Sequence, residues 1–205
     1  MNAIAKPDRD ERREGIVAIA REVFMEEGYG AASMSAIAAR VGGSKGTLYN
    51  YFKSKAELFG AVIQDDCATS QAALFDLEAA GGDIEKILHL LGGRVLRLLL
   101  SDEVIAVHRI VVAECARFPE LSQAHFEAGP RQSKERLRAL FVKAMDEGKL
   151  RRADPARAAE HAIELILAGL YKRRLWNMGP MPTDADIDAN VEAGVAVFMA
   201  AYGPK

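Results

Sequence analysis

Apolar residues recur with helical spacing along almost the whole chain. Ile16, Ile19, Ala20, Val23 and Phe24 occupy positions i, i+3, i+4, i+7 and i+8 of one helix that should stop at Gly28. Similar stripes begin near residues 84, 104, 137, 155 and 184. No segment alternates apolar and polar residues between turn residues, as a half-buried strand would. The pattern predicts an all-α fold of about nine helices.

Composition narrows the class of protein. The 205 residues suffice for one large or two small domains, and 50% hydrophobic with 27% charged residues is an ordinary globular balance. The 27 basic and 29 acidic side chains give a formal net charge of −2, so any contact with nucleic acid must come from a local basic patch.

Cysteine usage and the N-terminal residues indicate a cytoplasmic protein. The only cysteines, Cys67 and Cys115, form no CxxC pair, which argues against a disulfide framework or a structural zinc site. The first residues become charged at Lys6, which leaves no apolar core for a signal peptide. No uncharged apolar run approaches the ~18 residues that a membrane span needs, so we expect no membrane partner.

The spacing of turn residues divides the chain. Residues 30–60 contain short periodic pieces between Gly and Ser residues, whereas the helices after residue 61 are long. We therefore expect a helix-turn-helix domain over residues 1–56 and a larger helical domain over residues 57–205. A helix from Glu57 to about Leu77 should connect the two.

The short pieces have the order of a helix-turn-helix. Ser33 should cap one helix and Ser44 a second, with the turn at Gly42-Gly43 between them. Between Arg40 and Ala56 every charged side chain is basic, and a helix N-terminus beside lysines suits a phosphate. The alternative is a solvated charged face with ordinary surface tyrosines. The basic residues are Arg40, Lys45, Lys53 and Lys55.

Four sequence blocks in this region carry a resemblance to a known family. The blocks Ile16–Phe24, Glu27–Tyr29, Ser33–Ala38 and Gly43–Leu58 closely resemble, in order and spacing, the DNA-binding domain of TetR-family transcriptional regulators, over about residues 12–63. Gly43 departs from the pattern, since many members have a valine there. Residues 108–129 look, more loosely, like the AefR-like subgroup of that family.

The resemblance implies a homodimer that binds a palindromic DNA operator, usually as a repressor, and is released by a small-molecule effector. Ser33 and Lys55 would hold phosphates on either side of the recognition helix, and Ser44 caps that helix. Thr47, Tyr49 and Tyr51 carry groups that suit base edges or phosphates. The residues placed in the groove are Lys45, Gly46, Thr47, Tyr49, Asn50 and Tyr51.

The larger domain offers weaker signals for an effector site. His108 lies on an apolar stripe, either as a core histidine or as a polar group in a mostly apolar pocket. Trp176 either lines that pocket or packs at the dimer rim, and Cys115 is a small hydrophobe or a redox-sensitive thiol. A mostly apolar effector is expected among Ile63, Cys67, Leu91, His108, Val112, Phe141 and Trp176.

Small residues recur in the last two helices, 156–176 and 184–202. They would let helices approach closely, either across a dimer interface, as in the family, or within the chain. Zinc-protease, P-loop and GxSxG motifs are absent, so we expect no enzyme, cofactor or metal site. The alternative to a DNA-binding regulator is a helical protein-interaction module, or an enzyme without these motifs.

Overall fold

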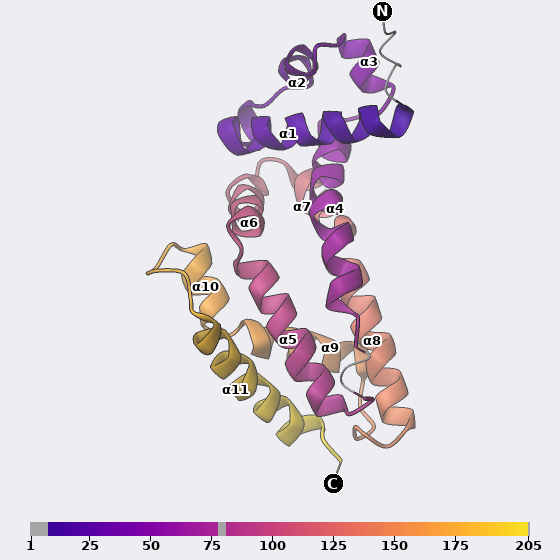
Figure 1. Cartoon of the computed structure of the whole chain (residues 1–205), viewed down its shortest axis with the longest axis vertical. Coiled ribbons are helices and arrows are strands. Elements are labelled where there is room, and N and C mark those ends of the chain that lie inside the picture. The colour runs from indigo at the N-terminus through magenta and orange to yellow at the C-terminus, as the bar shows by residue number, and fades with distance from the viewer. Residues whose placement is uncertain (1–7, 78–80, 205) are drawn as a thin grey trace, which may run out of the picture. The chain divides into compact units, whose positions relative to one another are not determined.

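The computed structural model describes residues 8–77 and 81–204, with side chains throughout except at residues 66–73 (Figure 1). Over these residues the chain is all-α, as predicted, but has eleven helices instead of about nine. They are α1 (Arg9–Ala31), α2 (Met34–Val41), α3 (Lys45–Tyr49), α4 (Lys55–Leu74), α5 (Ile84–Leu100), α6 (Asp102–Glu114), α7 (Pro119–Ala128), α8 (Pro130–Asp146), α9 (Pro155–Leu167), α10 (Leu170–Leu175) and α11 (Asp184–Tyr202).

The described chain forms two compact units. The first contains the residues up to Cys67 together with Arg109–Gly129, and the second contains Ala68–His108 and the residues from Pro130 onward. The segment 109–129, which the sequence groups with the larger domain, therefore packs with the N-terminal helices. The functional division at residue 57 stays a prediction.

Aromatic packing centres the first unit. A capping box of Asp8 and Glu11 starts α1. At Gly28 the backbone takes a φ of +77°, a conformation that glycine adopts without strain, so regular helix geometry is interrupted there as predicted. The turn brings the buried ring of Tyr29 against Phe24 and Phe59, at centroid distances of 5.8 and 5.4 Å. Burial of these large aromatic rings contributes strongly to the stability of the unit.

The core of the second unit is built from α5, α8, α9 and α11. Phe141 of α8 and Phe198 of α11 stack with ring centroids 5.2 Å apart, and both are buried. Arg97 of α5 donates to Asp184 and Asp188 at the start of α11. A Cβ atom at Gly194 would lie only 2.8 Å from the Leu165 carbonyl oxygen, so glycine permits the close approach of α9 and α11.

The predicted helix from Pro155 to about Trp176 is interrupted in the structure. Ala168 is extended and Gly169 has a φ of +81°, which separates α9 from the short α10. The side chain of Asn190 donates to the carbonyl of Ile166 at 2.7 Å and satisfies one acceptor at the end of α9. Apolar periodicity continues across this break, and for that reason the pattern alone does not reveal it.

None of the helices within residues 8–77 and 81–204 combines the length and the apolar character that crossing a bilayer requires.

Candidate nucleic-acid interface

Side-chain caps and a glycine turn fix the geometry of α2. Ser33 accepts a hydrogen bond from the backbone N–H of Ala36 at 3.1 Å, which starts the helix. Gly42 ends it in the left-handed conformation with a φ of +75°. Ile37 and Ala38 are buried against the rest of the unit. The first helix of the motif is therefore fixed by its own cap, its glycine turn and its buried side chains.

The second helix, α3, is short and strongly capped. The Ser44 hydroxyl accepts from the Thr47 N–H at 3.0 Å and lies 2.9 Å from the Thr47 hydroxyl oxygen. Leu48 anchors the helix and is buried. The remaining predicted groove residues point away from the core to different extents. Lys45, Gly46, Tyr49 and Asn50 are exposed, while Thr47 and Tyr51 are half-buried.

Capping also decides which groups of α3 remain available. Because the Thr47 hydroxyl contacts Ser44, its methyl group is the part that is free of a capping contact. The ammonium of Lys45 lies 5.9 Å from the centre of the Tyr49 ring, within cation–π range. The exposed end of α3 thus combines one cation, one aromatic ring and an apolar methyl group, all of which suit a DNA groove.

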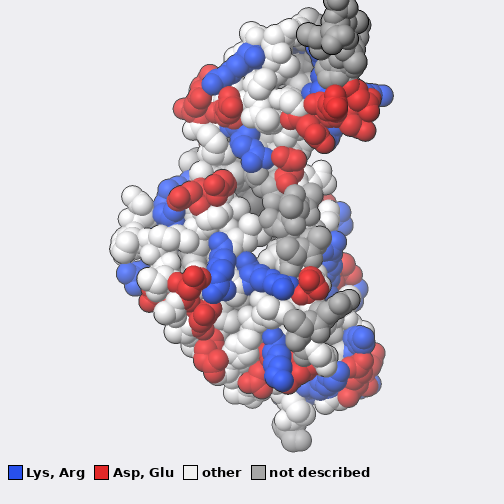
Figure 2. Space-filling model, viewed as in Figure 1, with Lys and Arg blue, Asp and Glu red and all other residues white. Residues whose placement is uncertain are grey.

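Two of the four predicted basic residues are engaged within the protein. The Arg40 guanidinium forms paired hydrogen bonds with the Glu26 carboxylate of α1, and the Lys55 ammonium donates to the carbonyls of Tyr29 and Ala32 at 2.5 and 2.9 Å. Lys45 and Lys53 are exposed. Figure 2 shows acidic and basic side chains interspersed over the face it presents. The basic patch is therefore narrower than the sequence count of four indicates.

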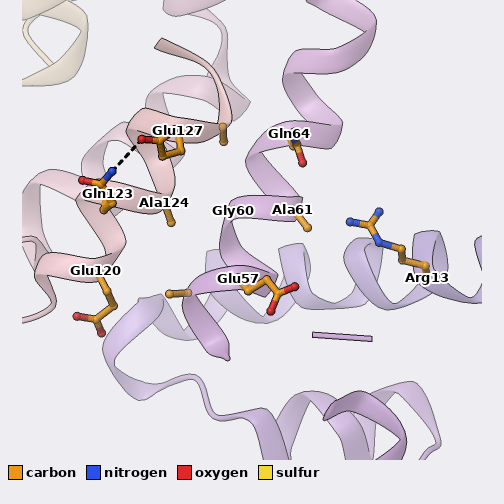
Figure 3. Close-up of a pocket in the computed structure, with 11 residues that line it drawn as sticks. Arg13, Glu57, Gly60, Ala61, Gln64, Glu120, Gln123, Ala124 and Glu127 are labelled. Atoms are coloured by element: carbon orange, nitrogen blue, oxygen red, sulfur yellow. Dashed lines mark hydrogen bonds between the residues drawn. The ribbon is translucent and has the colours of Figure 1, made fainter. Parts of the chain in front are cut away.

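A groove lies within the same unit, between α4 and α7 (Figure 3). Its volume is about 540 Å³, and Gly60 and Ala61 of α4 line it together with Ala124 of α7. Glu57, Glu120, Glu127, Gln64, Gln123 and Arg13 supply polar groups around it. Gln123 donates to Glu127 at 2.9 Å. None of the residues predicted to bind an effector lines this groove.

The predicted effector residues are distributed over both units. Ile63 and Val112 belong to the first unit, and the side chain of Val112 is 62% exposed. Leu91 and Phe141 are buried in the core of the second unit. The side chain of Cys67 lies outside the described residues.

His108 and Trp176 have different surroundings in the second unit. The Nδ1 atom of His108 lies 2.9 Å from the Tyr171 hydroxyl, so one of its partners is a side chain of α10. Burial raises the pKa of Tyr171, and the charge of Glu164 adds to the shift, so the phenol stays protonated. Trp176 is 65% exposed.

Two family comparisons cover most of the chain. Residues 16–62 match the family described as bacterial regulatory proteins, tetR family. Residues 86–204 match the AefR-like transcriptional repressor C-terminal domain, which is more than half of the chain.

The chain belongs to the TetR family of transcriptional regulators.

Solved structures of TetR-family regulators share the fold along nearly the whole chain. The flavonoid-responsive regulator FrrA is 29% identical with a TM-score of 0.81, covering 96% of this chain and 99% of that one. A TetR-family regulator from Mesorhizobium loti is 25% identical with a TM-score of 0.80, covering 97% and 100%. This TetR-family chain is thus a DNA-binding transcriptional regulator, as predicted, and its relatives are regulators and not enzymes.

Curated relatives match this regulator over a shorter range. The HTH-type transcriptional activator FasR of Mycolicibacterium smegmatis is 54% identical over 56 residues, which are 27% of this chain and 26% of that protein. An HTH-type transcriptional regulator of Staphylococcus aureus strain USA300 is 44% identical over 61 residues, 30% of this chain and 33% of that protein. The match spans only a quarter to a third of these curated relatives.

Proposed function

We propose that this regulator acts in the cytoplasm as a repressor, and that a small, mostly apolar effector releases it from a palindromic operator. The observation that carries the proposal is α3, which is capped by Ser44 and anchored by Leu48 while Lys45, Tyr49 and Asn50 are exposed. A rigid short helix with exposed polar and aromatic groups suits readout in a major groove. The match of the C-terminal part to an AefR-like repressor domain supports repression rather than activation.

The DNA contacts follow from the exposed ends of the motif. Ser33 at the start of α2 and Lys55 in the first turn of α4 contact phosphates on either side of α3, because helix N-termini favour anions. For Lys55 the phosphate contact comes through the N-terminal end of α4, because the Lys55 ammonium is already hydrogen-bonded to backbone carbonyls. The groove contacts come from Lys45, Gly46, Thr47, Tyr49, Asn50 and Tyr51, and Ser44 lies at the DNA-binding start of α3.

A second copy of the chain packs against α9 and α11 in this proposal. The outer side of α11 presents small apolar residues to solvent: Ala189, Ala193, Ala196, Val197 and Ala200. Gly194 and Ala162, in contrast, are buried within the chain. Small exposed residues let two helix pairs approach closely, and family members are dimers. The two helix-turn-helix domains then face successive half-sites of the operator.

The proposed effector site is lined, within the second unit, by Leu91, His108, Phe141 and Trp176. The bonded pair of His108 and Tyr171 supplies its polar anchor, and the remaining residues are mostly apolar. FrrA is named as flavonoid-responsive and is 29% identical to this chain, so polyphenolic aromatic compounds are the first effector class to test. Such compounds combine apolar rings with hydroxyl groups that a His–Tyr pair can bind.

A binding experiment tests the DNA-binding surface. The purified regulator is titrated into a fluorescent duplex from upstream of its own gene and into a random duplex of equal length. Thr47→Ala and Tyr49→Ala should each change base preference by about 1–3 kcal/mol on the specific duplex. Gln64→Ala, on α4 and away from α3, is the matched control. Equal losses on both duplexes would contradict the assignment of α3 to base readout.

A further inference from the structure

The end of α1 is held by aromatic rings that come from three parts of the first unit. The Tyr29 ring contacts Phe24 of α1, Phe59 of α4 and Phe118 in the segment between α6 and α7. The Tyr29 and Phe118 centroids are 5.3 Å apart and their planes are inclined by 73°. Tyr29 is 1% exposed, and burial raises its pKa to about 12, so the phenol stays neutral. The corner at Phe118 is thus part of the packing around α1.

Lys55 joins the two ends of the helix-turn-helix. Its ammonium donates to the carbonyls of Tyr29 and Ala32, just before α2 begins, while Lys55 itself is the first residue of α4, just after α3. Residues 33–54 therefore form a loop whose two ends are joined at the Lys55 ammonium, which is the anchoring point of the motif. The same ammonium lies 4.2 Å from the centre of the Tyr29 ring and 5.2 Å from that of Phe118.

Glu114 contributes a carboxylate to this anchoring point. It accepts a hydrogen bond from the backbone N–H of Gly30 at 3.3 Å. A Cβ atom at Gly30 would lie 2.9 Å from the same carboxylate oxygen, so the glycine permits the approach. Partial burial lowers the pKa of Lys55, and the charges of Glu114 and Glu120 oppose that shift. The carboxylate therefore favours the charged form of the lysine that ties the motif together.

We propose that Glu114 and Phe118 are positioning residues for DNA binding, which act on α2 and α3 through Lys55 and the end of α1. They hold residues 29–32 and the ammonium of Lys55 in one place, so they set the orientation from which residues 33–54 project. Neither residue touches DNA in this arrangement. The proposal rests on the DNA contacts proposed for α3, and it makes the segment 109–129 a working part of the DNA-binding unit.

The test replaces each group conservatively in the full-length protein. Phe118→Leu keeps an apolar side chain but removes the ring that faces Tyr29 and Lys55. Glu114→Gln keeps an acceptor for Gly30 but removes the charge near Lys55. Phe126→Leu and Glu127→Gln make the same chemical changes on α7, away from Tyr29 and Lys55, and serve as matched controls. The unfolding midpoint in urea shows whether each variant folds as stably as the wild type.

Two measurements separate positioning from direct contact. The first is affinity, at several salt concentrations, for a duplex that the wild type selects from a random library. Phe118→Leu should weaken binding about tenfold and Glu114→Gln several-fold, within the usual range of coupling between sites. The slope of log K against log salt should stay at the wild-type value, because no phosphate contact is removed. The controls should bind as the wild type does.

The second measurement needs no DNA. Amide hydrogen exchange of the free protein should become faster at residues 29–33 and 55–58 in Phe118→Leu and Glu114→Gln, and stay unchanged in the controls. Wild-type affinity and exchange in both variants would overturn the proposal. A reduced salt slope with unchanged exchange would also overturn it, since that outcome marks a direct phosphate contact. If the contacts proposed for α3 were wrong, the exchange result would still decide the positioning role.

Discussion

The Arg40 guanidinium and the Glu26 carboxylate form two hydrogen bonds, at 2.5 and 2.9 Å, that join the end of α2 to α1. A second carboxylate, Glu22, lies 3.5 Å from the same guanidinium. The hydrogen bond to Arg40 lowers the pKa of Glu26, so the pair stays charged near neutral pH. Arg40 therefore serves the packing of α2 on α1, while Lys53 remains exposed beside the motif.

This difference predicts unequal salt effects of the two cations. Because Lys53 is exposed beside the motif, we expect its ammonium to contact a phosphate. Lys53→Gln should then weaken binding nearly equally for all DNA sequences and reduce the salt slope by about 1. Arg40→Gln removes the same charge but should leave the slope unchanged. Fluorescence anisotropy titrations at four salt concentrations measure both. A fall in slope for Arg40→Gln equal to that for Lys53→Gln would show that Arg40 leaves Glu26 to bind DNA.

The outer side of α11 predicts how the dimer can be broken. Val197 is 55% exposed, so Val197→Glu should leave the fold intact and place a charge in the proposed interface. Sedimentation at micromolar concentration should show monomers, and operator affinity should fall, because two half-sites about 34–36 Å apart need two linked domains. Val142→Glu, at an exposed valine of α8, is the control. A wild type that sediments as a monomer would contradict the interface.

Gly194 tests a different property of the same helix. A side chain there would meet the Leu165 carbonyl at 2.8 Å, so Gly194→Ala should lower the free energy of unfolding by about 1–3 kcal/mol through overpacking. Loss of dimerisation in a Gly194 variant would therefore report damage within the chain. Comparing its urea unfolding midpoint with that of Val197→Glu separates the two effects.

Val112 tests whether the exposed face of α6 takes part in release by the effector. Because its side chain is 62% exposed, Val112→Trp should be accommodated by the fold. We expect this variant to bind the operator as the wild type does and to lose release by an apolar effector. Titration of the operator complex with the effector measures the response, and Val142→Trp is the control. An unchanged response in Val112→Trp would place the effector site elsewhere.

His125 of α7 predicts a dependence of stability on pH. Burial lowers the pKa of His125 below its ordinary value of 6.5, so around and below that pH the unfolded chain binds more protons than the folded one. The free energy of unfolding should therefore fall as the pH decreases through the ordinary value toward the folded one. Urea midpoints from about pH 7.5 to 5.5 should show this fall in the wild type and a smaller one in His125→Gln. An equal fall of the urea midpoint in both proteins would show that His125 is not the source of the pH dependence.

Local signals in the sequence predicted most of the helix-turn-helix. Ser33 and Ser44 act as caps and Gly42 takes the left-handed turn, because each of these roles depends on neighbours a few residues away. Helical periodicity also identified the buried residues of α5, α8 and α11. The number of cations available for DNA could not be predicted in this way. The sequence contains four basic residues in the motif, but Arg40 and Lys55 bind partners 14 and 26 residues away.

Contacts between distant segments were beyond the reach of the sequence. The pairing of Glu114 with Gly30 spans 84 residues, and no periodicity predicts which loop will meet the end of α1. Periodicity does not reveal the break at Gly169, because apolar residues keep helical spacing on both sides of it. The sequence alone does not decide between a core and a pocket role for His108, because its side-chain partner, Tyr171, lies 63 residues away.

The grouping of residues 109–129 with the N-terminal helices bears on how such regulators can be recombined. A chimaera that joins residues 1–56 to a foreign effector domain would leave Tyr29 and Lys55 without Phe118 and Glu114. A graft that preserves this unit must carry two separate pieces of sequence, and the foreign helices must accept both splice points. For this chain, exchange of DNA specificity is therefore simpler by substitution within α3 than by exchange of whole domains.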